Sequence, residues 1–232
     1  MSRHLTDPAP AMSPTGAMRP PASRPGIVAL VAAPVLVLVA DLLQPSPAGH
    51  DTASELASIA ADPGRYQLSA AVGWCAMLLY VPALLTLAWP ARRAFPRLAG
   101  TGLALAVAGL IALVSLMGSG PVSLAMAQAP DRAAMVQVTD AYESAPLTLA
   151  WMLLMVIGFS LGPVLLGFAL WRSGFTWAVP ALLLAGLVVQ MMDAGRWPLA
   201  LGYALTAAGM TVVAATLWRA GRGRVAPAPT RG

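Results

Sequence analysis

Charged and polar side chains at the ends of long apolar runs are the residues of this sequence best placed for chemistry. Asp41 lies near the end of one run, Gln190 and Asp193 end another, and Arg65 and Arg196 each precede a further run. At about 1.5 Å per residue, Asp41 and Asp193 reach a similar depth along their helices. Acids at that depth are costly unless a cation pairs with them. We therefore predict an ion-paired cluster of these five residues, either structural or a proton or cation site; the alternative is that both acids are simple interfacial anchors.

A second chemical motif, G-F-S-L-G at residues 158–162, matches the G-x-S-x-G pattern of hydrolase nucleophile elbows. That pattern works on a strand-to-helix turn with a histidine base nearby. Here it lies inside an apolar run, and the two histidines, His4 and His50, lie outside such runs. We therefore interpret Gly158 and Gly162 as a GxxxG motif that opens a groove for another helix, with Pro163 bending the helix beyond it. No catalytic residue is predicted.

Other enzyme and cofactor classes are excluded by residue type. All fourteen basic residues are Arg, so a retinal Schiff base to Lys cannot form. The two histidines cannot ligate a haem within the apolar runs. The single cysteine, Cys75, forms neither a thiolate cluster nor an intramolecular disulfide. The sequence predicts no metal and no cofactor.

The composition indicates a membrane protein. Of 232 residues, 58% are hydrophobic and only 10% are charged, whereas soluble domains carry about a quarter charged residues. The net charge of +5 comes from short Arg clusters beside apolar runs, where they set topology, so no nucleic-acid partner is predicted. The predicted partner is the lipid bilayer; a second copy of the chain or another membrane protein is left open.

The apolar runs predict an all-α membrane protein with six transmembrane helices. A transmembrane domain over 26–219 is expected between two disordered tails, 1–25 and 220–232. The expected spans are about 27–43, 68–89, 98–117, 146–171, 177–192 and 199–218.

Two short amphipathic helices are expected on the outer face, between the first and second spans and between the third and fourth. Thr52 and Glu55 fit a capping box at the start of the first, and Asp62, Pro63 and Gly64 end it. The second lies within residues 130–146, where Pro146 ends an apolar stripe.

The distribution of Arg predicts the orientation. With six spans, eleven Arg fall on one side and three on the other, counted along the printed chain. Because cytoplasmic loops carry an excess of Arg and Lys, both termini are predicted to be cytoplasmic. The three outer residues are Arg65, Arg132 and Arg196.

Small residues at four-residue spacing predict where helices pack most closely. The third span carries Gly100, Ala104, Ala108 and Ala112, and the fourth carries Gly158 and Gly162. Such ridges let two backbones approach each other. We therefore expect these two spans to pair at the centre of the bundle.

Four segments resemble those of a known group of membrane proteins: VLVLVADLLQPS, ADPGRY, VPALLTLA and LGFALWRSG, at residues 35–46, 61–66, 81–88 and 166–174. The order of elements over residues 27–218 resembles six-span integral membrane protein families of high-GC, actinomycete-type bacteria for which no function is assigned. The resemblance implies a six-helix fold and location in the bacterial plasma membrane. It supplies no activity, substrate or catalytic residue.

These observations lead to a non-enzymatic, multi-pass inner-membrane protein of structural, accessory or sensory role as the first hypothesis. The alternative is a small transporter or ligand-binding membrane protein with an outward-facing polar cavity lined by Asp41, Gln190 and Asp193. A continuous polar cavity reaching the membrane midplane would favour transport, whereas a dry core of Ala and Leu would favour a scaffold.

Overall fold

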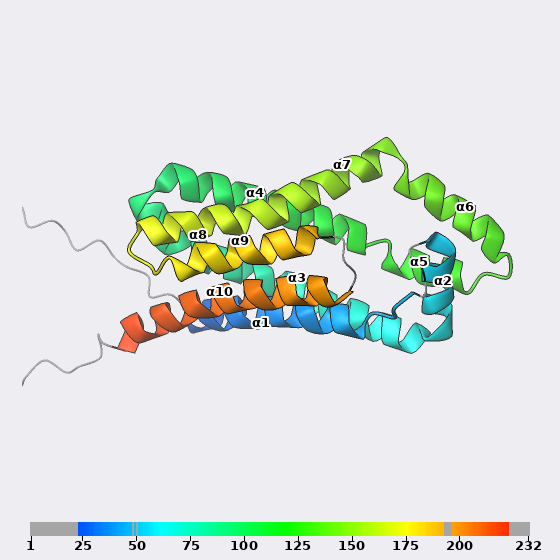
Figure 1. Ribbon diagram of the computed structural model, residues 1–232, viewed down its shortest axis with the longest axis horizontal. Helices are drawn as coiled ribbons and strands as arrows, with labels where there is room; N and C mark the ends of the chain where they lie inside the picture. The colour runs from blue at the N-terminus through cyan, green and yellow to red at the C-terminus, as the bar shows by residue number, and fades with distance from the viewer. Residues whose placement is uncertain (1–22, 48, 50, 193–195, 223–232) are drawn as a thin grey trace, which may run out of the picture.

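A computed structural model describes residues 23–47, 49, 51–192 and 196–222, and this part of the chain folds into helices without strands. The long segments lie side by side along the long axis of the molecule (Figure 1). They are α1 (Arg24–Leu43), α3 (Pro63–Ala94), α4 (Pro96–Met117), the run formed by α7 (Pro146–Met155), η1 (Val156–Leu161) and α8 (Gly162–Arg172), then α9 (Ala178–Met191) and α10 (Arg196–Arg222).

Three short helices gather at one end of the bundle, opposite the start of α1 and the end of α10 (Figure 1). They are α2 (Thr52–Ala61), α5 (Gly120–Ala127) and α6 (Arg132–Glu143), and we call them the cap. The sequence predicts α2 and α6 but not α5, which follows α4 after a turn at Gly118 and Ser119.

Five of the described helical segments are long and apolar enough to cross a membrane. The all-α class predicted from the sequence is confirmed for the described residues, and these apolar helices fit a multi-pass membrane protein. The fifth predicted span, 177–192, corresponds to α9, which has only 14 residues. At about 1.5 Å per residue α9 is roughly 21 Å long, shorter than the roughly 30 Å hydrocarbon layer.

Helix boundaries differ from the predictions mainly because the helices extend beyond their apolar runs. The longest, α3, starts at Pro63 instead of 68 and ends at Ala94 instead of 89, and the Asp62 side chain accepts a hydrogen bond from Arg65 N at 3.0 Å to cap its start. Residues 24–25 and 220–222, predicted as parts of disordered tails, are helical. The rest of both tails, except Ser23, which caps α1, lies outside the described residues.

The core of the bundle consists mainly of Ala and Leu side chains, as the packing of helices in lipid requires. Helix α1 packs between α3 and α10 and runs antiparallel to α3: Gly26 lies against Thr86 near the end of α3, and Ser69 Oγ near its start donates to Ala40 O at 2.7 Å. Lipid tails are as apolar as the core, so close contact between small residues holds such helices together. Fully buried examples are Leu30, Ala33, Ala76, Ala83, Leu87 and Ala91.

The cap has a small apolar core of its own. Leu56 and Ile59 of α2 pack with Ala127 of α5, and Met135 of α6 covers them in part. The structure corrects the predicted capping box: the residue that caps α2 is Asp51, whose carboxylate accepts from Ser54 N at 2.8 Å. Thr52 instead donates from Oγ1 to Asp140 Oδ1 at 2.5 Å, which ties α2 to α6.

One turn of the α7–α8 segment is a π-helix, η1, which the sequence analysis does not anticipate. Pro163 lies two residues after its end, beyond Gly162. Its ring lacks an N–H and would clash with the carbonyl of Phe159 four residues earlier, so a regular α-helical turn is unfavourable there. The bend expected at Pro163 thus takes the form of a wider, π-helical turn before it.

Candidate functional site

Side chains from α3 and α10 satisfy the last four backbone carbonyls of α1. Ser69 donates to the carbonyl of Ala40, and Arg196 Nη2 donates to that of Asp41 at 3.2 Å. Arg65 donates from Nη2 to Leu42 O at 3.0 Å and from Nε to Leu43 O at 2.7 Å. A second bond to Leu42 O comes from Arg196. Carbonyls at a helix C-terminus lack intrahelical partners and carry partial negative charge, so two guanidinium groups stabilise them.

The hydrogen bonds of the predicted cluster therefore differ from those expected, although Arg196 lies close enough to Asp41 for electrostatic attraction. Arg65 and Arg196 do come together at the end of α1, but their hydrogen bonds are to backbone carbonyls and, for Arg196, to Ser46 Oγ. Oδ2 of Asp41 is buried and has no hydrogen-bond partner among the described residues. Asp193 lies outside the described residues. The physical reason is that unsatisfied helix-end carbonyls compete for the same cations as carboxylates do.

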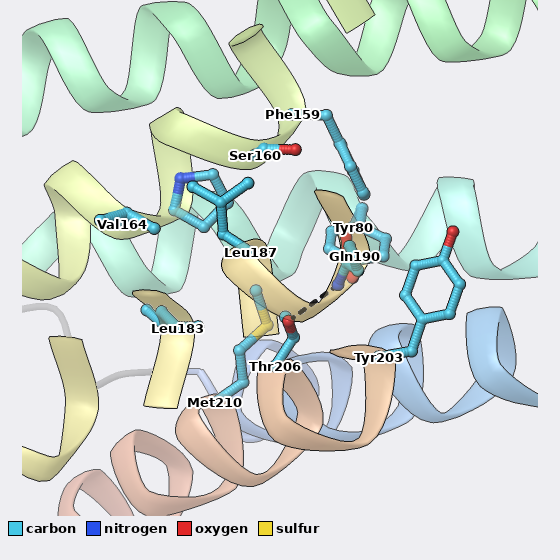
Figure 2. Close-up of a pocket in the computed structure, with 11 residues that line it drawn as sticks. Tyr80, Phe159, Ser160, Val164, Leu183, Leu187, Gln190, Tyr203, Thr206 and Met210 are labelled. Carbon is cyan, nitrogen blue, oxygen red and sulfur yellow. Dashed lines mark hydrogen bonds between the residues drawn. The ribbon is translucent and has the colours of Figure 1, made fainter. Parts of the chain in front are cut away.

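Gln190, the fifth predicted member, takes part in a different polar site. Its Nε2 donates to Thr206 Oγ1 at 3.3 Å, and this bond joins α9 to α10. The two helices are in close contact here: a Cβ on Gly202 would lie 2.5 Å from Cγ of Gln190. Figure 2 shows the Gln190 amide and the Thr206 hydroxyl facing each other.

A cavity of about 20 Å³ lies beside the Gln190–Thr206 pair, where α3, η1, α9 and α10 meet. Its polar lining side chains come from four segments, and its remaining lining is apolar. This volume holds about one water molecule. The polar members are Tyr80, Ser160, Gln190, Tyr203 and Thr206 (Figure 2).

Two of these residues are held by the fold. Tyr80 is only 2% exposed, and its ring meets that of Phe159 edge to face, with the centroids 5.0 Å apart. Ser160 lies in η1, so the π-helical turn places its hydroxyl at the cavity. Single-turn π-helices occur frequently at functional sites, and polar groups within membrane spans are often functional. This cavity is therefore the candidate functional site within the bundle.

The closest helix contact forms between α4 and the η1–α8 segment. A Cβ added to Gly158 would lie 2.5 Å from Leu105 O and 2.6 Å from Gly109 N, and one added to Gly162 would lie 2.5 Å from Ala106 N. Gly158 and Gly162 thus lie where the sequence analysis expects a close approach.

The ridge predicted on the partner helix, by contrast, is wrong at its first three positions, although its fourth member, Ala112, is buried. Around Gly100 a Cβ would meet nothing within 4 Å, Ala104 is exposed, and Ala108 is only half-buried. The buried ridge consists of Gly102, Ala106 and Gly109. Its first two members lie two residues after the predicted ones, and its third lies one residue after. In a helix with so many small residues, more than one face has the required spacing, and packing selects among them.

Asp51 and Glu55, the two acidic residues at the start of α2, have pKa values shifted in opposite directions. Hydrogen bonds from the side chain and backbone of Ser54 hold the pKa of Asp51 below its usual value. Burial of the carboxyl group, and then repulsion from Glu143, raise the pKa of Glu55. No group of three or more metal-ligating side chains is present among the described residues.

The chain matches no protein-family model, and neither a curated protein nor a solved structure is detectably similar to it.

Sequence reasoning missed Tyr203 as a site residue, and it missed Ser46 and Ser69 as partners at the end of α1. For Tyr203 a signal existed: it precedes Thr206 by three residues, so the two share one face of α10. For Ser46 and Ser69 there was none, because their partners are an arginine far along the chain and a backbone carbonyl.

Proposed function

We propose that this chain is a six-segment protein of the bacterial plasma membrane, with both termini cytoplasmic, and that it acts in a structural, accessory or sensory role. Its apolar helices are those of a multi-pass membrane protein. A role other than transport is supported by the small size of the internal cavity, about 20 Å³, in an interior otherwise packed with Ala and Leu.

The positions of two arginines support six crossings, although α9 is short. Arg172, at the end of α8, lies 5.0 Å above the ring of Phe95, where α3 ends. Arg196, at the start of α10, bonds to the other end of the bundle, where α1 ends. The chain between them must therefore pass from one end to the other, and α9 is its helical part. A helix shorter than the bilayer crosses by local thinning and by its flanking residues.

The orientation rests on the Arg distribution over the two ends of the bundle. Because Arg-rich ends face the cytoplasm, the cap lies on the outer face. Arg24, Arg92, Arg93, Arg97, Arg172 and Arg219 belong to the end where α1 starts, and Arg65, Arg132 and Arg196 to the cap end (Figure 1).

Cysteine accessibility tests both parts of this proposal. On a Cys75→Ala background, three single variants are labelled with a membrane-impermeant thiol reagent, first on intact cells and then after permeabilisation. We expect Ala57→Cys in the exposed face of α2 to react on intact cells, and Thr176→Cys to react only after permeabilisation. Ser160→Cys, at the cavity, is expected to stay unlabelled in both states and to react after denaturation. Labelling of Ser160→Cys in the folded protein would indicate a water-filled route and favour transport; exchange of the other two patterns would overturn the orientation.

A ligand-binding function at the cap end is the second candidate, and one observation favours it. Oδ2 of Asp41 is buried without a hydrogen-bond partner in the described part of the chain. A carboxylate with one buried, unpaired oxygen can bind a small cation or a proton. A melting temperature that rises with Na⁺ in wild type, but not in Asp41→Asn, would establish such a site; identical salt responses would remove it.

A further inference from the structure

A long groove on the outer surface of the bundle lies between α1 and α10. It has a volume of about 570 Å³ and an almost entirely apolar lining. From α1 it takes exposed residues such as Val28 and Val35, and from α10 it takes Ala215 and Trp218. Figure 1 shows the two helices side by side, so the groove follows their common direction.

The position of this groove indicates that lipid fills it. Both helices are long and apolar enough to cross a membrane, so a surface between them faces hydrocarbon. Val28 and Val35 are seven residues apart, which corresponds to roughly 10 Å along the helix. A groove of that length, parallel to the spans, fits part of one acyl chain.

One end of the groove has the chemistry of a headgroup site. Arg219 lines it next to Trp218, and α1 begins at this same end with Arg24. Indole rings favour the interface between headgroups and hydrocarbon, and a guanidinium group binds phosphate with two parallel hydrogen bonds. An apolar trough with a cation at its interfacial end matches the shape and charge of an anionic phospholipid.

We propose that the α1–α10 groove binds one anionic phospholipid, with an acyl chain between the helices and the phosphate at Arg219. The site is separate from the internal cavity and involves none of its residues. The proposal needs the chain to lie in a membrane, but it does not depend on the absence of transport.

Native mass spectrometry of the delipidated protein in detergent tests this proposal, with phosphatidylglycerol and phosphatidylcholine as the probes. Wild type is expected to retain one phosphatidylglycerol under conditions in which phosphatidylcholine is lost. Arg219→Gln removes the headgroup cation, and Ala215→Phe fills the trough from an exposed position. Each is expected to weaken phosphatidylglycerol binding about tenfold, with Arg219→Lys between wild type and Arg219→Gln.

Two matched controls separate a specific site from general lipid coating. Arg93→Gln removes a cation at the same end of the bundle, and Ala185→Phe enlarges an exposed side chain on α9. Both should bind phosphatidylglycerol like wild type, and all variants should keep the wild-type melting temperature. Equal retention of the two lipids by wild type, or equal loss in the Arg93 and Arg219 variants, would overturn the site. A loss with Arg219→Gln but not with Ala215→Phe would place the lipid outside the groove and overturn it also.

Discussion

Arg65 at the start of α3 and Arg196 at the start of α10 donate hydrogen bonds to the same acceptor, the carbonyl oxygen of Leu42. One backbone atom at the end of α1 thus connects three helices. Hydrogen bonds from charged donors are worth about 1.5 to 3 kcal/mol, more than neutral ones. The relationship gives these arginines a structural role in the bundle.

Arg196→Gln should lower the free energy of unfolding by about 1 to 3 kcal/mol, because the carbonyls of Asp41 and Leu42 lose a charged donor. Arg93→Gln, at an exposed position over Trp89, is the matched control and should change it little. The measurement is denaturant unfolding in detergent. Since both arginines share Leu42 O, the losses in Arg65→Gln and Arg196→Gln should not add in the double variant. Equal effects of Arg93→Gln and Arg196→Gln would contradict the capping role.

Asp41→Asn should leave the free energy of unfolding within about 0.5 kcal/mol of wild type or raise it. The reason is that the replaced carboxylate has an unsatisfied buried oxygen and the arginines bind backbone carbonyls instead. The same unfolding experiment at neutral pH measures this. A loss of more than about 1 kcal/mol, relieved by a second change at Arg196, would restore the ion pair predicted from the sequence.

Gly158→Ala should destabilise the protein by about 1 to 3 kcal/mol, because its methyl group would overlap the backbone of α4 at Leu105 and Gly109. Gly100→Ala is the control, since its methyl group would meet nothing within 4 Å and Ala favours a helix more than Gly does. Thermal melting of both variants in detergent distinguishes them. Similar melting temperatures would show that the α4–η1 contact can open at no cost.

Glu55→Gln should make the protein more stable at neutral pH, and the gain should vanish near pH 4. The folded protein raises the pKa of Glu55, so at pH values above the ordinary pKa of 4.5 the unfolded chain loses this proton more readily. The charged carboxyl group therefore destabilises the folded protein. This destabilisation is absent at low pH and complete above the raised pKa. Because Glu55 as a whole is exposed, the gain should be small.

A change at Asp51 should have the opposite pH dependence. Its pKa is lowered on folding, so its contribution is present at neutral pH and is lost as the pH falls through the folded pKa. Asp51→Ala should therefore destabilise the cap at neutral pH and converge with wild type in acid. Melting temperatures from about pH 3 to 8 give both profiles. Parallel profiles for the Glu55 and Asp51 variants would contradict the assigned signs.

The long helices could be predicted from the sequence because an apolar run in lipid has few alternatives to a helix. The amphipathic segments that become α2 and α6 were predictable from periodicity for a similar reason. The helix-capping prediction was wrong at one position. Thr52 and Asp51 are both good helix caps, and only the structure shows that Asp51 accepts the hydrogen bond from Ser54 N.

The site itself could be predicted only in part, because its members meet through tertiary structure. Gln190 was identified as an unusual polar residue, but its partner Thr206 comes from the next helix and the π-helical turn that brings in Ser160 has no sequence signature. The hydrogen-bond acceptors of Arg65 and Arg196 were not predicted because backbone carbonyls are present at every position. A pattern of side chains alone therefore favoured the nearby carboxylates.

The position of α1 between α3 and α10 also determines when the protein can finish folding. During synthesis α1 and Arg65 are made early in the described part of the chain, whereas Arg196 is made only after all the other described helices. Until then the flank of α1 that α10 covers is open and the carbonyl of Asp41 lacks its arginine. The first described helix is thus completed by the last, so a chain that stops before α10 should leave one flank of α1 uncovered and be less stable than the full bundle.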